Sequence, residues 1–353
     1  MKLSSLEHMP SFALLGPGFG DGQCALLTDL AETTSQPQLV YAPFECPGDS
    51  PRRFKACDHG PVQIEFATIS TDVTPSLRDT GYREAIERIR AAISAGDVYQ
   101  VCYTVRADIP RVSGADLLTL LCQSGVPRFL AWARLPDGEE FVSASPELFF
   151  ETRGNLVHAE PMKGTGGRDG ALELELSEKD KAELAMITDL LRNDLTPVCK
   201  PRSVRVPCAR RTIELPYAVQ TVSDVTGELA AGMTPLDVLS ALHPGGSVTG
   251  APKQAALQMI RELEPTPRGA YCGALGLWRG DRSVFSLLIR TAERTAAGWT
   301  YGVGSGVVYD SSADSEYEEL HIKLKALGRL SDPSSGSRRI LQADQTAQSG
   351  TSC

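Results

Sequence analysis

The sequence lacks several features that define other protein classes. It has no excess of basic residues, because 35 Lys and Arg stand against 44 Asp and Glu, for a net charge of −9. A nucleic-acid-binding protein usually needs basic stripes that neutralise phosphates, so the composition argues against a nucleic-acid partner. A local cluster of cations inside a cleft could still bind a small anionic substrate.

Paired cysteines and long apolar runs are also missing. The nine cysteines are odd in number, irregularly spaced and form no Cys-x-x-Cys motif. We therefore expect reduced thiols in a cytoplasmic protein, and the five scattered histidines argue against a zinc site. Residues 1–20 lack the pattern of a signal peptide, and no apolar run reaches the ~18–20 residues of a membrane span, so no membrane partner is expected.

The patterns that are present indicate an α+β protein. Residues 1–75 are rich in Pro, Gly and short apolar runs, which is typical of short strands and turns. Residues 77–95 have helical periodicity that ends at Gly96, and residues 98–106 alternate as a strand. Arg153-Gly154-Asn155 indicates a hairpin turn. Further helices are expected over residues 177–193, 234–242, 253–263 and 313–330, and further strands over residues 273–278, 284–290, 299–303 and 306–308.

The domain organisation follows from the same pass along the chain. No linker interrupts the alternation of helices and strands, which favours a single large domain. We expect residues 1–75 to form a strand-rich part of this domain and residues 76–330 to form its catalytic region. Residues 331–353 are rich in Ser, Gln and Ala, which predicts a disordered tail.

Two pairs of carboxylates have helical spacing. Asp180 and Glu183 are three residues apart in one predicted helix, and Glu316 and Glu319 repeat this spacing in the last helix. Each pair therefore shares one helix face. Two such helices could place four carboxylates around one Mg²⁺, a cation that prefers oxygen ligands. The spacing is equally compatible with two solvated acidic faces, which are the commoner arrangement.

Two glycine-rich segments could approach a ligand closely. Residues 244–253, Pro-Gly-Gly-Ser-Val-Thr-Gly-Ala-Pro-Lys, precede a predicted helix and could offer backbone N–H groups to an anion. They are no Walker A loop, because Gln254 stands where Ser or Thr is needed, and a tight turn with a helix cap is the alternative. Residues 302–306 alternate glycine at the end of a strand, which permits close approach of a ligand or a bulge.

Two cations follow apolar strands. Arg290 comes after the apolar residues 284–289, so its charge must form a salt bridge or bind a ligand such as a carboxylate. Lys163 lies between an apolar strand and Gly164-Thr165. A buried lysine near other cations becomes a nucleophile, whereas an ordinary surface lysine is the alternative.

Nine short blocks carry a resemblance to a known family. The first four are residues 96–101 (Gly-Asp-Val-Tyr-Gln-Val), 143–147 (Ser-Ala-Ser-Pro-Glu), 161–165 (Pro-Met-Lys-Gly-Thr) and 189–194 (Asp-Leu-Leu-Arg-Asn-Asp). The others are residues 244–253, 270–273, 289–291, 304–308 and 316–323. In this order, over about residues 80–330, they resemble the chorismate-utilising enzymes, which include anthranilate, aminodeoxychorismate, isochorismate and salicylate synthases. The resemblance implies two packed antiparallel β-sheets with outer helices and a site in a cleft.

The resemblance also implies roles for individual residues. The Mg²⁺ ligands would be the acids of the two helices, namely Asp180, Glu183, Glu316 and Glu319. The substrate contacts would be Thr165, Tyr271, Arg290, Gly304, Gly306 and Lys323. Glu147 resembles a structural or supporting residue of the family.

Two positions distinguish the members of the family. Isochorismate and salicylate synthases resemble each other in a water-activating lysine at the position of Gln100, and a glutamine cannot be that base. Anthranilate synthases usually have alanine at the position of Lys163, whereas aminodeoxychorismate synthases have lysine there. The resemblance is therefore closest to component I of aminodeoxychorismate synthase, which makes 4-amino-4-deoxychorismate for 4-aminobenzoate and folate.

The implied chemistry is nucleophilic catalysis on chorismate. Lys163 would add at C2 while Mg²⁺ and an acid assist loss of the C4 hydroxyl, and ammonia would then add at C4 and expel the lysine. The sequence shows no Cys-His-Glu apparatus for glutamine hydrolysis, so ammonia is expected from a separate glutaminase (amidotransferase) subunit.

The chain departs from the family at several positions. Gln220 stands where many members have histidine, and a glutamine is no general acid of ordinary pKa. Gly166-Gly167-Arg168 replaces a common Arg-Pro-Arg, and Asp180 replaces a glutamate. The alternatives are an anthranilate or 2-amino-2-deoxyisochorismate synthase component I and, in another class, a non-catalytic chorismate-binding protein.

Overall fold

The computed structural model describes residues 1–325, except for 21, 49, 67–74, 79–80, 110–111, 124, 167–176 and 216–217. The predicted tail, residues 331–353, lies outside the described residues. So do Gly167 and Arg168, and residues 326–330 of the predicted last helix. Seven cysteines carry free thiols, as expected for them, namely Cys24, Cys46, Cys57, Cys102, Cys122, Cys199 and Cys272.

Strands contain more of the described residues than helices do. In chain order they are β1 (Phe12–Leu15), β2 (Cys24–Glu32), β3 (Leu39–Ala42), β4 (Arg52–Val62), β5 (Ser76–Arg78), β6 (Gln100–Ile109), β7 (Phe129–Arg134), β8 (Glu140–Ser145), β9 (Leu148–Arg153), β10 (Leu156–Ala159), β11 (Met162–Gly166), β12 (Arg205–Glu214), β13 (Val219–Glu228), β14 (Gly250–Ala251), β15 (Ala274–Arg279), β16 (Arg282–Leu287), β17 (Thr291–Thr295) and β18 (Gly298–Val307).

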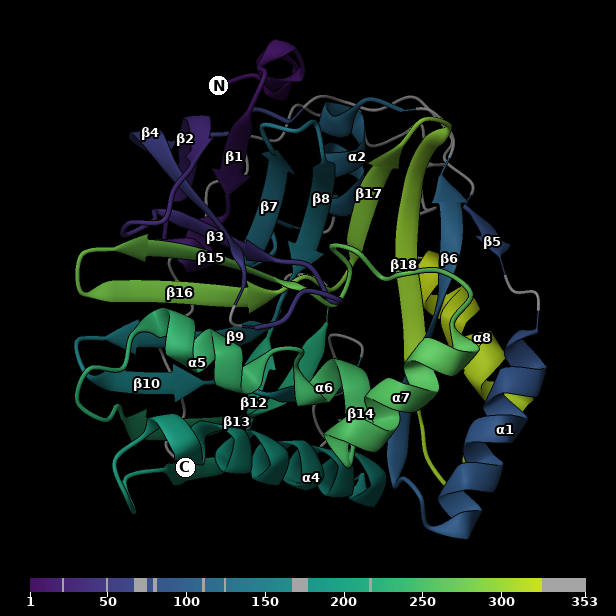
Figure 1. Cartoon of the computed structure of the whole chain (residues 1–353). Helices are drawn as coiled ribbons and strands as arrows, with labels where there is room; N and C mark the ends of the chain where they lie inside the picture. The colour runs from purple at the N-terminus through teal and green to yellow at the C-terminus, as the bar shows by residue number, and fades with distance from the viewer. Residues whose placement is uncertain are drawn as a thin grey trace.

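The helices lie on the outside of these strands (Figure 1). The α-helices are α1 (Tyr82–Ala95), α2 (Gly114–Leu121), α4 (Glu178–Leu195), α5 (Pro235–Leu242), α6 (Gly246–Thr249), α7 (Lys253–Leu263) and α8 (Ala313–Lys325). The 3₁₀-helices are η1 (Leu3–His8), η2 (Pro17–Phe19) and η3 (Thr196–Val198). Helices α2 and α6 were not among the predicted helices.

All strands belong to one hydrogen-bonded sheet of 18 strands. The pairings run from β6 through β18, β17, β8, β7, β1, β2, β4, β3, β15, β16, β9 and β10 to β13, all antiparallel. Strands β5 and β14 pair with β6, and β11 and β12 pair with β13. The antiparallel α+β class is therefore correct, but the expectation of two separate sheets is wrong.

The sheet stays continuous because β2 and β4 carry it round a corner. Their register shifts between Ala25 and Leu27 and again between Thr28 and Ala31, and such irregularities let paired strands bend and twist. On one side of this corner β7, β8, β17 and β18 run up the view of Figure 1, whereas β15, β16 and β10 run across it. The two arms can thus face each other without a break in the hydrogen-bonded ladder.

An apolar core fills the space between the two arms. It combines Leu15 and Phe141 from the first arm with Tyr41, Leu275 and Val284 from the second, all fully or almost fully buried. The rings of Tyr41 and Phe141 stack with their centroids 5.0 Å apart. Burying one such side chain contributes about 1.5–3 kcal/mol before entropy is counted, so this core is a main reason why the arms stay together.

Helix ends follow the local sequence closely. The Ser177 hydroxyl accepts a hydrogen bond from the Asp180 N–H at 3.2 Å, which confirms Ser177 as the N-cap of α4. Helix α1 begins five residues later than predicted, at Tyr82, because Leu77 pairs with Ala107 of β6 in a strand.

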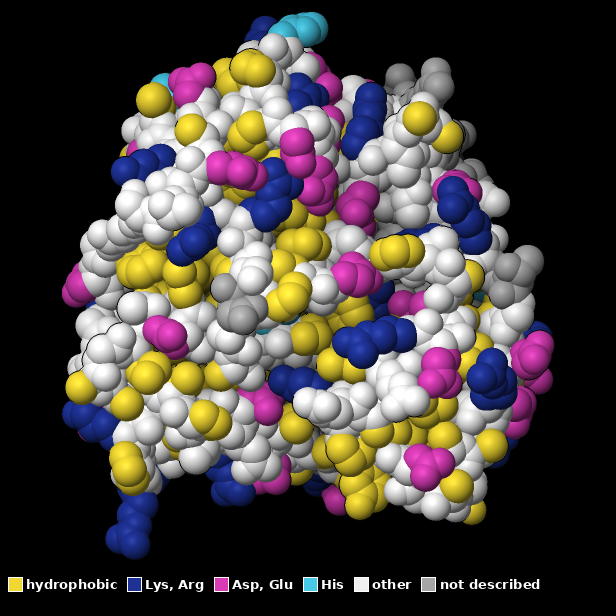
Figure 2. Space-filling view, viewed as in Figure 1, with side chains coloured by type: hydrophobic (Ala, Val, Ile, Leu, Met, Phe, Trp, Pro, Cys, Tyr) yellow, Lys and Arg dark blue, Asp and Glu magenta, His cyan; other side chains and the backbone are white. Residues whose placement is uncertain are grey.

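Acidic, basic and apolar side chains are interspersed over the face that carries α5, α6 and α7 (Figure 2).

Candidate active site

One face of β18 is built from glycines. Gly302, Gly304 and Gly306 project to the same side, because alternate residues of a strand share a face. Gly304 and Gly306 are partly accessible, whereas the residues between and beside them, such as Val303 and Val307, are buried on the other side. We call this open side, formed by the three glycines, the glycine face. It spans about 13 Å at roughly 3.4 Å per residue.

Strand β6 supplies the neighbouring polar side chains. Cys102, Thr104 and Arg106 are paired with Gly306, Gly304 and Gly302. These three residues and Gln100 are polar and buried, whereas the alternate residues of β6, such as Val101 and Tyr103, belong to the apolar core. The expected alternation of this strand is confirmed. It separates a polar face beside the glycines from an apolar face under α1 and α8.

Lys163, the predicted nucleophile, lies at the Gly306 end of the glycine face. A Cβ atom built on Gly306 would lie 3.8 Å from Lys163 Nζ and only 2.3 Å from Gln100 Nε2. The carbonyl of Lys163 accepts a hydrogen bond of 2.6 Å from the Thr221 hydroxyl of β13. The register of β11 shifts directly after Lys163, where Gly164 has a φ of 70°. Strand β11 is therefore anchored at the lysine itself.

Glu147, expected from the sequence to have only a structural or supporting role, has the burial and bonding of a candidate proton donor. It lies between β8 and β9 with 5% of its surface exposed, and the Ser247 hydroxyl donates to its Oε1 at 3.0 Å. Burial raises the pKa of Glu147 to about 7, against the opposing effects of Ser247 and Lys163. A carboxyl group with this pKa can exchange a proton near neutral pH. The strand-end Ser-Pro-Glu motif was the only sequence signal.

The acids of α4 and α8 each lie close to a lysine. Glu183 Oε2 is 3.9 Å from Lys163 Nζ, and Glu319 Oε1 is 2.7 Å from Lys323 Nζ. Lys323 also donates a hydrogen bond of 2.6 Å to the Gly304 carbonyl. Helix α8 is thus tied to the middle of the glycine face, and α4 reaches its Gly306 end.

The buried thiol of Cys102 lies within the field of several of these charged side chains. Burial raises the pKa of Cys102, and Lys163, Arg268 and Lys323 oppose this shift, whereas the negative charge of Glu183 adds to it. Charges act strongly only over short distances in a protein. Residues from β11, α4 and α8, which are far apart in the sequence, therefore meet beside β6.

Glu316 fits the role of a cation ligand. It is 4% exposed, and its Oε1 accepts a hydrogen bond of 2.7 Å from the Ser311 hydroxyl. Its Oε2 is buried without a hydrogen-bond partner among the residues that the structure describes. A buried carboxylate oxygen without a donor is costly unless a cation binds to it. Asp180, Glu183, Glu316 and Glu319 do not come together as a cluster of three or more ligand atoms in the described part of the chain, so a shared Mg²⁺ site remains a prediction.

Of the other predicted residues, Tyr271 lies against the glycine face, whereas Arg290 and Gln220 are placed by contacts with other strands. Tyr271 is 8% exposed, and its ring lies against Gly302, where a Cβ atom would come within 2.1 Å of the ring. Arg290 is half-buried between β16 and β17, has a φ of 54° and accepts a hydrogen bond of 3.1 Å on its carbonyl from the Ala144 N–H. Gln220 is buried on β13, where its backbone is paired with Thr165 of β11.

Gln100 is fully buried beside Lys163. Its Nε2 is 3.9 Å from Cys102 Sγ, and its Oε1 has no hydrogen-bond partner within the described part of the chain. The amide therefore offers an acceptor, but no proton-abstracting group, at the lysine end of the glycine face.

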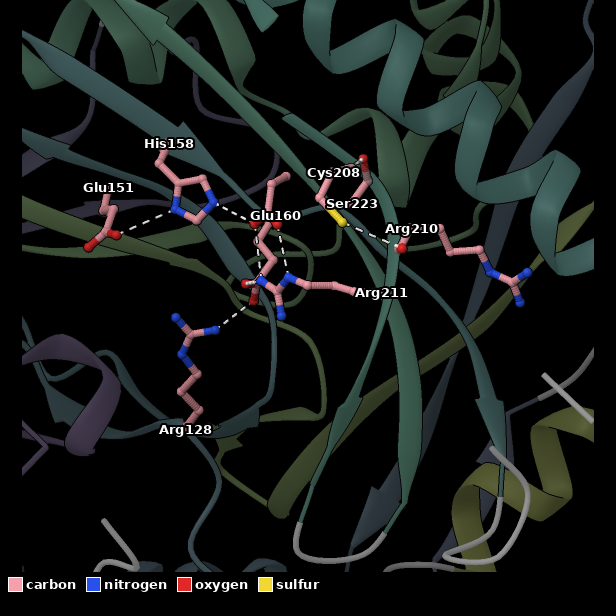
Figure 3. A network of polar contacts seen from close by, with 9 residues as sticks. Arg128, Glu151, His158, Glu160, Cys208, Arg210, Arg211 and Ser223 are labelled. Carbon is pink, nitrogen blue, oxygen red and sulfur yellow. Dashed lines mark hydrogen bonds and ion pairs between the residues drawn. The ribbon is translucent and has the colours of Figure 1, made fainter. Parts of the chain in front are cut away.

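A second charged cluster lies on β10, β12 and β13 (Figure 3). His158, Glu160 and Asp224 have the composition of a metal site, because their ligand atoms lie within 4.8 Å of one another. However, Arg128 donates to Glu160 Oε1 at 2.6 Å, and Arg211 donates to Asp224 at 2.8 Å and also to Glu160. Two guanidinium groups therefore already supply the positive charge that a metal would bring.

The protonation state of His158 also argues against a metal ion in this cluster. Burial opposes a charge on His158, but hydrogen bonds to Asp224 at 2.8 Å and Glu151 at 3.4 Å outweigh burial and raise the pKa of His158 to about 9. At neutral pH both ring nitrogens carry protons, so neither offers a lone pair to a metal. The cluster is an ion network rather than a metal centre.

No described helix combines the length and apolar character that a membrane-spanning helix requires.

Known proteins are similar to this chain in sequence and fold. Residues 34–329 match the family described as chorismate binding enzyme. The chain is 36% identical over 288 residues to an anthranilate synthase component 1 of Haloarcula marismortui, covering 79% of this chain and 58% of that protein. It is 35% identical over 288 residues to aminodeoxychorismate synthase component 1 of Bacillus subtilis, covering 79% of this chain and 61% of that protein.

A solved structure agrees with these sequence relatives. Anthranilate synthase component I from Streptococcus pneumoniae superposes with a TM-score of 0.67 and 29% identity, covering 75% of this chain and 61% of that chain. The present chain thus spans about three fifths of the length of each of these relatives. The family match nevertheless extends over most of the chain and includes every residue of the glycine face. The chain belongs to the chorismate binding enzyme family.

Proposed function

We propose that this protein aminates chorismate, as component I of an aminodeoxychorismate synthase. The observation that carries the proposal is the position of Lys163, whose ammonium group lies at the glycine face, 3.9 Å from Glu183 and within the field of the buried Glu147. An amine in this place can act as a nucleophile towards a ligand that lies on the glycine face.

The substrate is held along the glycine face in this proposal. Tyr271 and Arg290 serve one carboxylate of chorismate, and Lys323 serves the other charges with the backbone of Gly304 and Gly306. The side chain of Thr165 lies outside the described part of the chain, and its contact with the substrate stays a prediction. A Cβ atom at any glycine of this face would collide with Tyr271, Thr104 or Gln100, so glycine is needed for the strand to approach these groups closely.

The proposed reaction has two displacement steps. The unprotonated Lys163 amine forms a bond to ring C2, the two ring double bonds shift, and the C4–O bond breaks. The leaving hydroxyl takes a proton from Glu147 and departs as water. Ammonia then bonds to C4, the double bonds shift back, and the bond between C2 and Lys163 breaks. The proton lost by the added ammonia returns to Glu147, so the enzyme ends as it began.

Asp180, Glu183, Glu316 and Glu319 hold Mg²⁺ in this proposal. When bound, the metal supplies charge stabilisation for the carboxylate of the substrate and polarises the departing oxygen. The unpartnered Oε2 of Glu316 supports this assignment. Gln220 cannot supply a proton in the first step, and Glu147 takes the role that a histidine at that position would have.

Ammonia comes from a glutaminase subunit in this proposal. The two relatives are both named component 1, which is consistent with a second component that supplies the nitrogen. Gln100 would receive ammonia at the lysine end of the glycine face, because its Oε1 is a buried acceptor without a partner in the described structure.

Anthranilate synthase is the second candidate, because a relative of that name is equally similar to the chain. The two functions differ in where ammonia bonds to the ring. Direct attack at C2 needs no covalent lysine and gives a 2-amino product.

A product assay with Lys163→Ala tests the proposal. Purified enzyme, chorismate, Mg²⁺ and ammonium at alkaline pH should give 4-amino-4-deoxychorismate, identified by mass and ultraviolet spectrum, and the variant should lose it. Full retention of this product in the variant would exclude the covalent mechanism. A 2-amino product would identify an anthranilate-type enzyme, and no consumption of chorismate would leave a binding protein.

A further inference from the structure

Arg106 is a buried cation beside the glycine face. It lies on β6, directly opposite Gly302, and is 8% exposed. Its Nη2 donates a hydrogen bond of 2.8 Å to the Pro267 carbonyl. Its Nη1 is buried with no hydrogen-bond partner in the described ranges of the chain. A buried guanidinium that shares its charge with no carboxylate is expensive to keep, so its retention calls for a physical reason.

The carboxylate of Glu293 does not neutralise the guanidinium group of Arg106 by direct contact. Glu293 lies within the field of Arg106, which lowers the pKa of Glu293 against the larger raising effect of burial. The Glu293 carboxylate is instead used by the backbone, because its Oε1 accepts from the Tyr271 N–H at 3.3 Å. Arg106 therefore acts on Glu293 through space but forms no contact ion pair with a carboxylate in the described structure.

Tyr271 lies directly against this charge. The guanidinium carbon of Arg106 is 5.3 Å from the centroid of the Tyr271 ring. A Cβ atom on Gly302 would be 2.1 Å from the Tyr271 ring and 2.6 Å from Arg106 Nη1. Glycine at position 302 thus makes room for both groups. The ring is fixed between the strand backbone and the cation, an arrangement in which charge and ring quadrupole attract each other.

We propose that Arg106 is a positioning residue for substrate recognition, which holds the Tyr271 ring and strengthens its hydroxyl as a donor to a substrate carboxylate. A cation over the ring face withdraws electron density from the phenol and creates a positive potential where a carboxylate would lie. Burial, which is the largest effect, keeps the pKa of Tyr271 well above its usual range, so the hydroxyl stays protonated and able to donate. This inference rests on the proposed function, in which Tyr271 contacts a carboxylate of chorismate.

Arg268 provides a comparison for fold stability alone, because its charge also acts on Tyr271. It is 1% exposed and also stacks on a ring, with its guanidinium carbon 4.3 Å from the centroid of Phe44. Unlike Arg106, it has all the partners it needs, because Glu264 accepts from it at 2.7 and 2.9 Å and two carbonyls accept from its other N–H groups. The two residues share burial and ring contact and differ in whether a carboxylate contacts the guanidinium group in the described structure.

The test replaces each arginine by methionine, which keeps the length of the side chain and removes the charge. For Arg106→Met we expect the KM for chorismate, and the Kd from calorimetric titration without ammonia, to rise about tenfold. We expect kcat to change little and Tm not to fall, because replacing a buried cation that forms no contact ion pair by an apolar side chain is often neutral or stabilising. For Arg268→Met we expect the opposite, a clear loss of Tm, because Glu264 is left buried and unpaired.

A double-mutant cycle with Tyr271→Phe separates a positioning role from a structural one. If Arg106 acts through the Tyr271 hydroxyl, Arg106→Met should weaken chorismate binding in the native background and have little further effect in the Tyr271→Phe background. Arg106→Lys keeps a charge in place and should restore part of the affinity. Where Arg106→Met does not fold, Arg106→Gln carries the same comparison without the charge.

The outcomes show whether the role of Tyr271 in the proposed function is wrong or only the role of Arg106. If Tyr271→Phe leaves the affinity for chorismate unchanged, both the role of Tyr271 in the proposed function and this inference are wrong. If Tyr271→Phe weakens binding but Arg106→Met does not, or if the two effects multiply independently, only the inference is overturned. A fall in Tm for Arg106→Met as large as that for Arg268→Met would also show that the residue is merely structural.

Discussion

The ion network of Figure 3 and the glycine face both concentrate charge, but they differ in how that charge is used. In the ion network, Glu160 and Asp224 accept hydrogen bonds from arginines and from His158. Arg106 and Gln100 at the glycine face and Glu316 on α8 each keep one buried polar atom without a partner in the described structure. Satisfied charges stabilise a fold, whereas unsatisfied ones are expected where a ligand completes the set.

This contrast shows why composition alone misidentifies metal sites. His158, Glu160 and Asp224 are close enough together to hold an ion, yet their negative charge is already matched by Arg128 and Arg211. Glu316 has no cation within hydrogen-bonding distance of its Oε2 among the described residues. The number of partners already present, rather than the identity of the ligands, separates the two regions.

The largest effect is expected for Glu147, which donates and recovers a proton at the glycine face in the proposed reaction. We expect Glu147→Gln to lower kcat about 10²–10⁴-fold, the usual contribution of a general acid. Steady-state kcat values of the native enzyme and the variant, measured with saturating chorismate at the same free ammonia concentration, check this loss. A variant that keeps the native kcat would rule out Glu147 as the acid.

The second prediction contrasts the two possible metal sites. Mg²⁺ that binds the folded protein should raise Tm, and Glu316→Gln should weaken this effect by about 10–100-fold in Mg²⁺ concentration. His158→Gln is the matched control from the ion network and should leave the Mg²⁺ dependence of Tm unchanged. A thermal-shift titration with both variants gives the answer. If His158→Gln removes the Mg²⁺ effect and Glu316→Gln does not, the contrast between the regions is reversed.

The third prediction removes the centre of the ion network. Glu160 is 3% exposed and is bonded to Arg128 and Arg211, whose side chains are 39% and 27% exposed. Loss of a buried partner of an ion pair costs about 3–5 kcal/mol when the other charge stays buried. Because solvent can reach both arginines, we expect Glu160→Gln to lower the free energy of unfolding by about 2 kcal/mol.

Urea unfolding of this variant checks the magnitude. Glu151→Gln, at the more exposed edge of the same network, should cost clearly less. Equal losses for the two variants would show that burial of the ion pairs is not what makes the network stabilising.

Sequence patterns predicted the parts of this molecule that depend on local chemistry. Ser177 caps α4, and Pro252 precedes α7, as their residue types indicate. Alternation along β6 identified a strand with one polar and one apolar face. The resemblance to the family then indicated which residues to look for around Lys163.

The remaining features depend on contacts between distant segments. The pKa of Glu147 results from burial, from Ser247 and from Lys163, and no local pattern contains all three. The single sheet depends on register shifts between β2 and β4, which hydrophobic periodicity does not reveal. The ion network joins residues beside β7 and β10 and on β9, β10, β12 and β13, and no local sequence pattern links these segments.

The smallest effect concerns the pH dependence of the ion network. The pKa of His158 is raised to about 9 from about 6.5 in an unfolded chain. The charged histidine therefore stabilises the fold fully below about pH 6.5, and this contribution is lost as the pH rises through about 9. We expect the free energy of unfolding to fall by on the order of 1–2 kcal/mol over this range, since His158 is partly reached by solvent. Unfolding in urea at pH 6, 7.5 and 9 should show the decline in the native protein and a flatter profile in His158→Gln, in which the neutral side chain can still bond to Asp224. A decline of equal size in both proteins would mean that another group titrates, and that the network does not depend on the charge of His158.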